Sequence, residues 1–202
     1  RSSVNLDFSN IEALLIKRHS KMLVTVEDNG DSAKFADLRF NVLYPIEESI
    51  VDFKYIPLAH VFQDKHHKTK IIRESIRNML VTQGGSDTYG FTPKIVRALY
   101  AIHADIDINV ILGPNFSHDE ELRKVLDKSP RRFNLVRGLR DLSDIMMEAD
   151  LAVSAGGNTL FELSCLGVPT VVVCEEPFEA ETADRMQKEG FGINLGFGEY
   201  VD

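Results

Sequence analysis

The chain contains only two cysteines, no tryptophan and no long hydrophobic run. Two cysteines make no disulfide framework, and we expect Cys165 and Cys174 to be buried free thiols. No run approaches the length of a membrane span and no signal-peptide pattern opens the chain, so we expect no membrane segment and a cytoplasmic protein. Basic residues are also outnumbered, and the net charge of −8 argues against a nucleic acid or an anionic membrane as partner.

The composition that remains is that of an ordinary globular protein, with 44% hydrophobic and 27% charged residues. A chain of 202 residues can hold one large domain, or one complete domain and part of another. The first residue is Arg1 rather than methionine. We therefore expect a processed product or a piece of a longer polypeptide.

Residues 1–75 are predicted to be the incomplete end of an N-terminal α/β domain followed by a linker. Their pattern indicates too few elements to complete a doubly wound domain. The expected elements are a helix at 10–18, a buried strand at 21–26, a turn at 27–30, strands at 40–44 and 55–61, and the linker at 63–75.

Residues 76–202 are predicted to form a complete α/β domain with a doubly wound parallel sheet, that is, a Rossmann-like domain. The expected strands are continuous apolar runs, separated by helices at short spacing, which is typical of a parallel sheet covered on both faces. We expect strands at 79–82, 108–112, 133–136, 150–154, 170–173 and 193–195, and helices at 92–102, 118–126, 141–148, 158–167 and 180–189. Thr92 is the expected cap of the first of these helices.

Two glycine-rich turns follow predicted strands, and each is a candidate anion site. They are Gly84-Gly85-Ser86-Asp87 and Gly156-Gly157-Asn158-Thr159. A tight strand-to-helix turn leaves backbone N–H groups at the positive end of a helix dipole, at the carboxyl edge of the sheet. A purely steric need for glycine is the alternative for either turn alone.

The turns also exclude two common phosphate motifs. No lysine follows the glycines as in a Walker loop, and the three-glycine spacing of nicotinamide-binding folds is absent. Glu162 lies about one helical turn beyond the second set of glycines, where a carboxylate could accept two sugar hydroxyls. We interpret this stretch as the grip on the diphosphate and ribose of a nucleotide-sugar, with no metal and no further cofactor.

The remaining candidates have less support. His66 and His67 lie in the predicted linker and are expected to meet solvent rather than a metal. His118 is either a general acid or base or a capping residue at the protein surface. Four glutamates follow the predicted strand at 170–173 and form either a solvated acidic loop or a surface facing the sugar: Glu175, Glu176, Glu179 and Glu181.

Together these residues resemble the C-terminal, nucleotide-binding half of the GT-B glycosyltransferases, which carry two Rossmann-like domains. The branch is the one that contains the bacterial N-acetylglucosaminyltransferase that makes lipid II. The chain is more closely similar to the UDP-sugar hydrolases of pseudaminic acid biosynthesis and to spore-coat polysaccharide proteins. The resemblance covers most of residues 20–198. It is carried by both glycine turns, Ala149-Asp150, Leu160 to Leu163, Gly167-Val168-Pro169 and Thr182-Ala183.

The resemblance implies a set of roles for a UDP-sugar site. The glycine turns and their hydroxyl residues would hold the diphosphate, Glu162 the ribose and Leu139, within 136–141, the uracil. Glu179 and Thr182 stand where the transferases have Gln-x-x-Asn-Ala, so this stretch is more similar to the hydrolase branch. The glycine-rich loop with the catalytic histidine of that branch has no counterpart here.

The sequence thus predicts UDP-sugar binding and hydrolysis in surface-glycan or nonulosonic (sialic-type) acid biosynthesis, in a piece that lacks the catalytic loop. The catalytic residue is unknown, and the partners would be UDP-sugar or UDP and the missing N-terminal region. Two alternatives remain open. One is the donor domain of a UDP-sugar glycosyltransferase, and the other is a non-catalytic module fused to a sugar-acid cytidylyltransferase.

Overall fold

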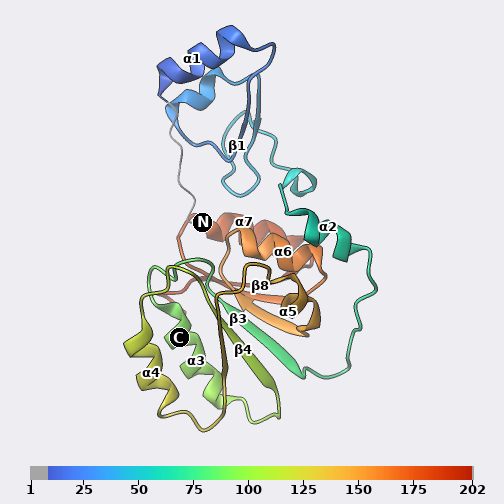
Figure 1. The fold of residues 1–202 in the computed structure, drawn as a ribbon, viewed down its shortest axis with the longest axis vertical. Helices are drawn as coiled ribbons and strands as arrows, with labels where there is room; N and C mark the ends of the chain where they lie inside the picture. Colours follow the sequence, from blue (N-terminus) through green and yellow to red (C-terminus); the bar gives the residue numbers. More distant parts are fainter. Residues whose placement is uncertain (1–8, 202) are drawn as a thin grey trace. The chain divides into compact units, whose positions relative to one another are not determined.

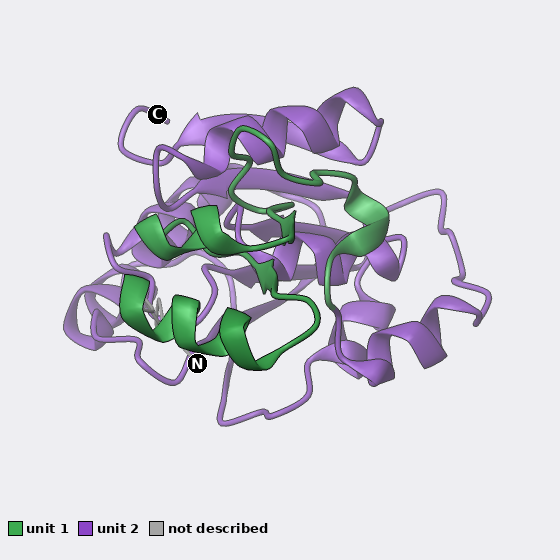
Figure 2. Cartoon of the chain, turned by 90° about the horizontal axis from the view of Figure 1, so that it is seen from above, with its two compact units in different colours: residues 1–57 green, residues 58–202 purple. Residues whose placement is uncertain are grey.

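A computed structural model describes residues 9–201, which divide after Pro57 into two compact units (Figure 2). This division falls before the predicted domain boundary at residue 75. The reason is that residues 60–66 form helix α2 (His60–His66), which contacts helices α5 and α6 of the larger unit. The assignment of functional domains stays a prediction.

The smaller unit contains helix α1 (Asn10–His19), two short strands and two 3-10 helices. Helix α1 confirms the predicted helix and begins with a capping box, in which Ser9 and Glu12 bond each other's backbone amides. The strands β1 (Val24–Val26) and β2 (Leu38–Phe40) pair in parallel. The 3-10 helices are η1 (Asp31–Phe35) and η2 (Phe53–Tyr55).

Three strand predictions in this unit are wrong in extent or type. Strand β1 is half the predicted length and is not buried, since Val24 is 44% and Val26 50% exposed. Only Phe40 of the predicted strand 40–44 belongs to β2. The amide of Asn41 donates to the carbonyl oxygen of Ile50, and the amides of residues 42–44 donate to the carboxylate of Glu27 rather than to a ladder. The predicted strand 55–61 extends past Pro57 into the larger unit and consists of the last residue of η2, an irregular stretch at 56–59 and the first two residues of α2.

The larger unit contains a six-stranded, fully parallel sheet in the order β5-β4-β3-β6-β7-β8 (Figure 1). Its strands are β3 (Asn78–Thr82), β4 (Asp107–Leu112), β5 (Asn134–Arg137), β6 (Leu151–Ser154), β7 (Thr170–Cys174) and β8 (Gly192–Phe197). The helices are α3 (Phe91–Ala98), η3 (Leu99–Ala101), α4 (Asp119–Leu126), α5 (Ser143–Glu148), α6 (Asn158–Cys165) and α7 (Glu179–Lys188). The predicted doubly wound parallel sheet is therefore confirmed, and strand order reverses between β3 and β6.

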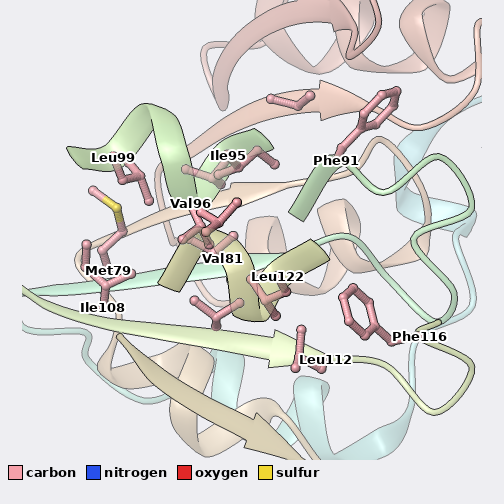
Figure 3. Close-up of a cluster of buried hydrophobic side chains, with 14 residues drawn as sticks. Met79, Val81, Phe91, Ile95, Val96, Leu99, Ile108, Leu112, Phe116 and Leu122 are labelled. Carbon is pink, nitrogen blue, oxygen red and sulfur yellow. The ribbon is translucent and has the colours of Figure 1, made fainter. Parts of the chain in front are cut away.

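Apolar side chains cover both faces of this sheet, as continuous apolar strands require. On one face, Met79 and Val81 of β3 pack with Ile95 and Val96 of α3 and Leu122 of α4 (Figure 3). On the other face, a second cluster joins α2, α5 and α6 to the strands through Phe62, Leu80, Ile111, Met146, Ala152 and Leu163. The strands are thereby held by helices on both sides, and their carboxyl ends are fixed relative to one another.

The predicted linker is tied to the larger unit rather than free. The buried amino group of Lys65 donates to Ser143 Oγ at 2.7 Å, at the first residue of α5. Lys70 Nζ donates to the carbonyl oxygens of Met147 and Ala149 at 2.7 and 2.8 Å, at the other end of the same helix. A cation near the last carbonyls of a helix is stabilising, so this polar segment anchors α5.

Both cysteines are free thiols, and their burial differs. Cys174 is buried at the end of β7, and burial raises the pKa of its thiol to about 12. Cys165 is only partly buried in α6. None of the helices within residues 9–201 combines the length and the apolar character that crossing a membrane requires.

Candidate functional site

The two glycine turns lie at the carboxyl ends of neighbouring strands. Residues 84–87 follow β3 and residues 156–159 follow β6, and Thr82 and Ser154 are register partners in the last rung between those strands. This is the point where the strand order reverses, which is where open α/β sheets bind ligands. The structure thus brings together two sequence segments that lie about 70 residues apart.

The first turn, residues 84–87, has open space beside its glycines and is contacted by the loop that follows β4. A side chain at Gly84 or Gly85 would meet no atom within 4 Å. Gly113, after β4, lies so close that a Cβ there would fall 2.4 Å from the carbonyl oxygens of both glycines. The amide of Asn115 also donates to Gly85 O at 3.0 Å, so the loop after β4 fixes the position of the turn.

Asp87 is a residue of this turn whose role the sequence reasoning missed. Its carboxylate is buried and accepts hydrogen bonds from the amides of Phe91 at 2.7 Å and Thr92 at 2.9 Å. The prediction that Thr92 caps helix α3 is therefore wrong, because the preceding acid reaches the first amides instead. The carboxylate of Asp87 occupies the first amides of α3, so Gly84 and Gly85 are the part of the turn with open space beside it, and Ser86 between them and Asp87 is half-buried. The aspartate that follows Gly-Gly-Ser in the sequence is the signal that could have predicted this cap.

The second turn opens helix α6 without a side-chain cap. Gly157 is the N-cap residue, and it provides no side-chain capping hydrogen bond. Asn158 is exposed, and Gly157 and Thr159 are half-buried. An uncapped helix start carries partial positive charge, which suits an anion. Gly156 is different, because it is buried and its amide donates to Glu179 Oε2.

Glu179 fastens two loops together. Its Oε2 atom accepts hydrogen bonds from the amides of Gly156 at 3.1 Å, Glu175 at 2.8 Å and Glu176 at 3.4 Å. The side chain is 7% exposed, and burial raises the pKa of its carboxyl against the opposing effect of these amides. Thr182, one turn later in α7, is fully buried. Contacts of either residue with a sugar stay predictions, and the observed role of Glu179 is to hold backbone.

Glu162 has the opposite character. Its carboxyl is half-buried in α6 and has no hydrogen-bond or ion-pair partner within the described part of the chain. Burial, and secondly the negative charge of Asp141, raise its pKa to about 7. Asp141 is held by the amide of Ser143 at 2.8 Å, in the loop before α5. A half-buried carboxyl without a partner is what a ligand with hydroxyl groups would satisfy.

The loop after β5 carries the residue expected to contact uracil. Leu139 is 49% exposed and follows Gly138, whose φ of 72° favours glycine. Asp141, in the same loop, acts electrostatically on Glu162, so this loop lies near α6. The structure thus brings the predicted base-binding loop and the predicted ribose-binding carboxyl to the same region of the larger unit.

The other candidates are placed as follows. His66 and His67 are exposed, as predicted, and His66 Nδ1 lies 2.7 Å from the carbonyl oxygen of Cys165. His118 stands at the N-cap of α4, makes no capping bond, and lies edge-on to Phe116 with ring centroids 5.8 Å apart. Glu175 accepts a hydrogen bond from the amide of Thr88, and burial raises the pKa of its carboxyl to about 7. Residues 9–201 hold no group of three or more histidine, cysteine or acidic side chains placed to bind a metal.

No family model matches the chain, but comparison with known proteins gives several relatives. The chain is 28% identical over 194 residues to the spore coat polysaccharide biosynthesis protein SpsG of Bacillus subtilis, covering 90% of this chain and 57% of that protein. It is 28% identical over 125 residues to the UDP-N-acetylglucosamine–N-acetylmuramyl-(pentapeptide) pyrophosphoryl-undecaprenol N-acetylglucosamine transferase of Lacticaseibacillus casei, covering 59% of this chain and 34% of that protein.

Among solved structures, MurG of Acinetobacter baumannii aligns with a TM-score of 0.58 at 15% identity, covering 91% of this chain and 56% of that one. At 15% sequence identity, this structural similarity shows the fold only. The chain spans a third to somewhat more than half of the length of these relatives. With the strand order and the two covered faces of the sheet, the comparisons establish a Rossmann-like α/β fold of the GT-B glycosyltransferase kind.

Proposed function

We propose that this chain is the nucleotide-sugar-binding part of a glycosyltransferase-like protein of polysaccharide biosynthesis, acting on a UDP-sugar. The observation that carries the proposal is the meeting of two glycine turns at the strand-order reversal, beside the partnerless carboxyl of Glu162. The names of the relatives point the same way, since one belongs to polysaccharide biosynthesis and the other to a UDP-N-acetylglucosamine transferase.

The geometry suggests how each part of a UDP-sugar would be held. The uncapped start of α6 and the open turn at 84–86 would face the diphosphate, because backbone N–H groups and a helix dipole stabilise negative charge. Glu162 would accept hydrogen bonds from the ribose hydroxyls, and the loop at Leu139 would face the base. When the bond between sugar and phosphate breaks, the same amides would stabilise the departing UDP.

Transfer to an acceptor is the reaction that we favour over the hydrolysis predicted from the sequence. Of the two relatives, the one named for a reaction is a transferase, and the comparisons give no support for hydrolysis, pseudaminic acid or sialic acid chemistry. The residue that activates the acceptor is not assigned within this chain. Its part of the reaction is donor binding and stabilisation of the leaving group.

Titration calorimetry of the chain with UDP, pyrophosphate, uridine and CMP tests the proposal. We expect UDP to bind more tightly than pyrophosphate or CMP, because only UDP fills both the diphosphate and the nucleoside regions. Glu162→Ala should weaken UDP by about tenfold, for loss of hydrogen bonds to a charged group, and leave pyrophosphate nearly unchanged. Glu121→Ala is the matched control, because Glu121 is an exposed residue of α4.

Two results would contradict the proposal. One is a chain that binds neither UDP nor pyrophosphate. The other is an equal loss of both ligands in Glu162→Ala, which would remove the ribose role. Release of UDP from UDP-N-acetylglucosamine by the full-length protein without acceptor would revive hydrolysis, and release only with an acceptor would support transfer.

A further inference from the structure

Gln83 has a polar side chain whose burial the fold does not explain. It directly follows β3 and precedes Gly84, and it is 1% exposed. Neither its Nε2 nor its Oε1 atom has a hydrogen-bond partner among the described residues. Among the buried amide side chains of residues 9–201, only that of Gln83 lacks partners at both atoms. Burying an amide without hydrogen-bond partners costs free energy, whereas burying an apolar side chain of similar size is favourable.

A second unpartnered polar group lies at the end of the neighbouring strand. Ser154 is the last residue of β6, is fully buried, and its hydroxyl has no partner within residues 9–201. Its register partner in β3 is Thr82, the residue just before Gln83. The two unpartnered groups therefore lie at the carboxyl ends of adjacent strands, with Gln83 directly before its glycine turn and Ser154 two residues before the other.

The space next to Gln83 is open although Gln83 itself is buried. Extra atoms at Gly84 or Gly85 would meet nothing within 4 Å. On the far side, helix α6 starts without a side-chain cap shortly after Ser154. Two residues with unpartnered donor groups therefore precede, along the chain, two backbone segments suited to an anion, and a phosphate oxygen is a strong acceptor for such donors.

We propose that Gln83 and Ser154 are further binding residues for the diphosphate, and that the Nε2 group of Gln83 and the hydroxyl of Ser154 donate hydrogen bonds to phosphate oxygens when these occupy the two turns. The inference rests on the proposed nucleotide-sugar function and adds two residues to it. It also gives a reason for their burial. The two donor groups are unpaired while the site is empty, which destabilises the ligand-free protein, and they gain acceptors when the diphosphate binds.

Gln83→Met tests this inference, since methionine has nearly the same length and shape without the amide. We expect the ligand-free variant to unfold at the same temperature as the wild type or higher, because an unpaired buried amide is gone. Affinity for both UDP and pyrophosphate should fall about tenfold by calorimetry, and affinity for uridine should stay unchanged. A merely structural glutamine would give the reverse, with lower thermal stability and the same affinity.

Ser154→Ala provides a second test that does not depend on the folding of the first variant. We expect a smaller loss of UDP and pyrophosphate affinity, about threefold to tenfold. Ser32→Ala is its matched control, because Ser32 is 2% exposed with an equally unpartnered hydroxyl and lies in the smaller unit. This control should change stability to a similar degree and leave affinity unchanged.

The outcomes separate the two proposals. If the wild type binds UDP and both Gln83→Met and Ser154→Ala bind it within twofold of the wild type, the inference is overturned and the proposed function stands. The inference is also overturned if uridine loses affinity as much as pyrophosphate does. If the wild type binds neither UDP nor pyrophosphate, both proposals fall.

Discussion

The Oε2 atom of Glu179 lies 3.1 Å from the amide nitrogen of Gly156, and this hydrogen bond joins residues 23 positions apart. It links the start of α7 to the turn before α6, and the same oxygen holds the two amides that follow β7. One carboxylate thereby sets the position of two loops at the carboxyl edge of the sheet. The first two predictions below follow from this contact.

Gly156→Ala should destabilise the protein because the new methyl group has no room. A Cβ at this position would lie 2.7 Å from Glu179 Cβ, which is part of a helix and cannot easily move away. We expect the free energy of unfolding to fall by about 1 to 3 kcal/mol, as for other overpacked sites. Gly85→Ala is the control, with nothing within 4 Å of its Cβ, and should change stability by less than about 1 kcal/mol. Urea denaturation measures both, and equal losses would contradict the crowding at Gly156.

Glu179→Ala should cost more than an exposed glutamate on the same helix. The change leaves the amides of Gly156, Glu175 and Glu176 without their acceptor, and we expect a loss of about 2 to 4 kcal/mol in the free energy of unfolding. Glu181→Ala, on the exposed side of α7, should stay within about 0.5 kcal/mol of the wild type. A Glu179→Ala variant as stable as Glu181→Ala would show that the carboxylate does not hold these loops.

Asp87→Ala should destabilise α3 through two effects. The variant loses the carboxylate that accepts from Phe91 and Thr92, and it places alanine at a φ of 47°. Together these should lower the free energy of unfolding by about 2 kcal/mol. Asp87→Asn should lose less, since asparagine tolerates this φ and can still accept one bond. Thermal and urea denaturation against Asp105→Ala, an exposed aspartate, would check the order. An Asp87→Asn variant as unstable as Asp87→Ala would argue against the cap.

Glu162 should make the free energy of unfolding depend on pH, and the substitution Glu162→Gln should remove this dependence. In the folded chain burial and Asp141 raise the pKa of this carboxyl from 4.5 to about 7. The unfolded state therefore ionises first as the pH rises, and the free energy of unfolding should fall between about pH 4.5 and 7. We expect Glu162→Gln to match the wild type near pH 4 and to exceed it by about 1 to 3 kcal/mol near pH 8.

Urea denaturation at both pH values measures this difference. Glu121→Gln, which is exposed on α4, is the control and should leave the pH dependence of the wild type intact. A Glu162→Gln variant that gains no stability at high pH relative to low pH would mean that the carboxyl is solvated in the folded chain.

Much of the larger unit could be predicted from the sequence, because its signals are local. Continuous apolar runs such as Val81 and its neighbours, broken by helices, indicate parallel strands covered on both sides, and all six predicted strands are present. The two glycine turns could also be placed at strand ends from their spacing. The smaller unit gave weaker signals, and the predicted strand at 55–61 is wrong, because residues 56–59 are irregular and lie between the end of η2 and the start of α2.

The sequence by itself therefore determined the fold class, the turns and the acidic residue in α6. Only the tertiary structure decided that β3 and β6 are neighbours and that Asp87 rather than Thr92 caps α3. It also decided that Glu179 binds backbone, while Glu162 has no partner among residues 9–201. The physical reason is one of range. Periodicity and turn chemistry act over a few residues, whereas strand order, burial of a carboxylate and the choice of its hydrogen-bond donors depend on segments that meet only when the sheet is assembled.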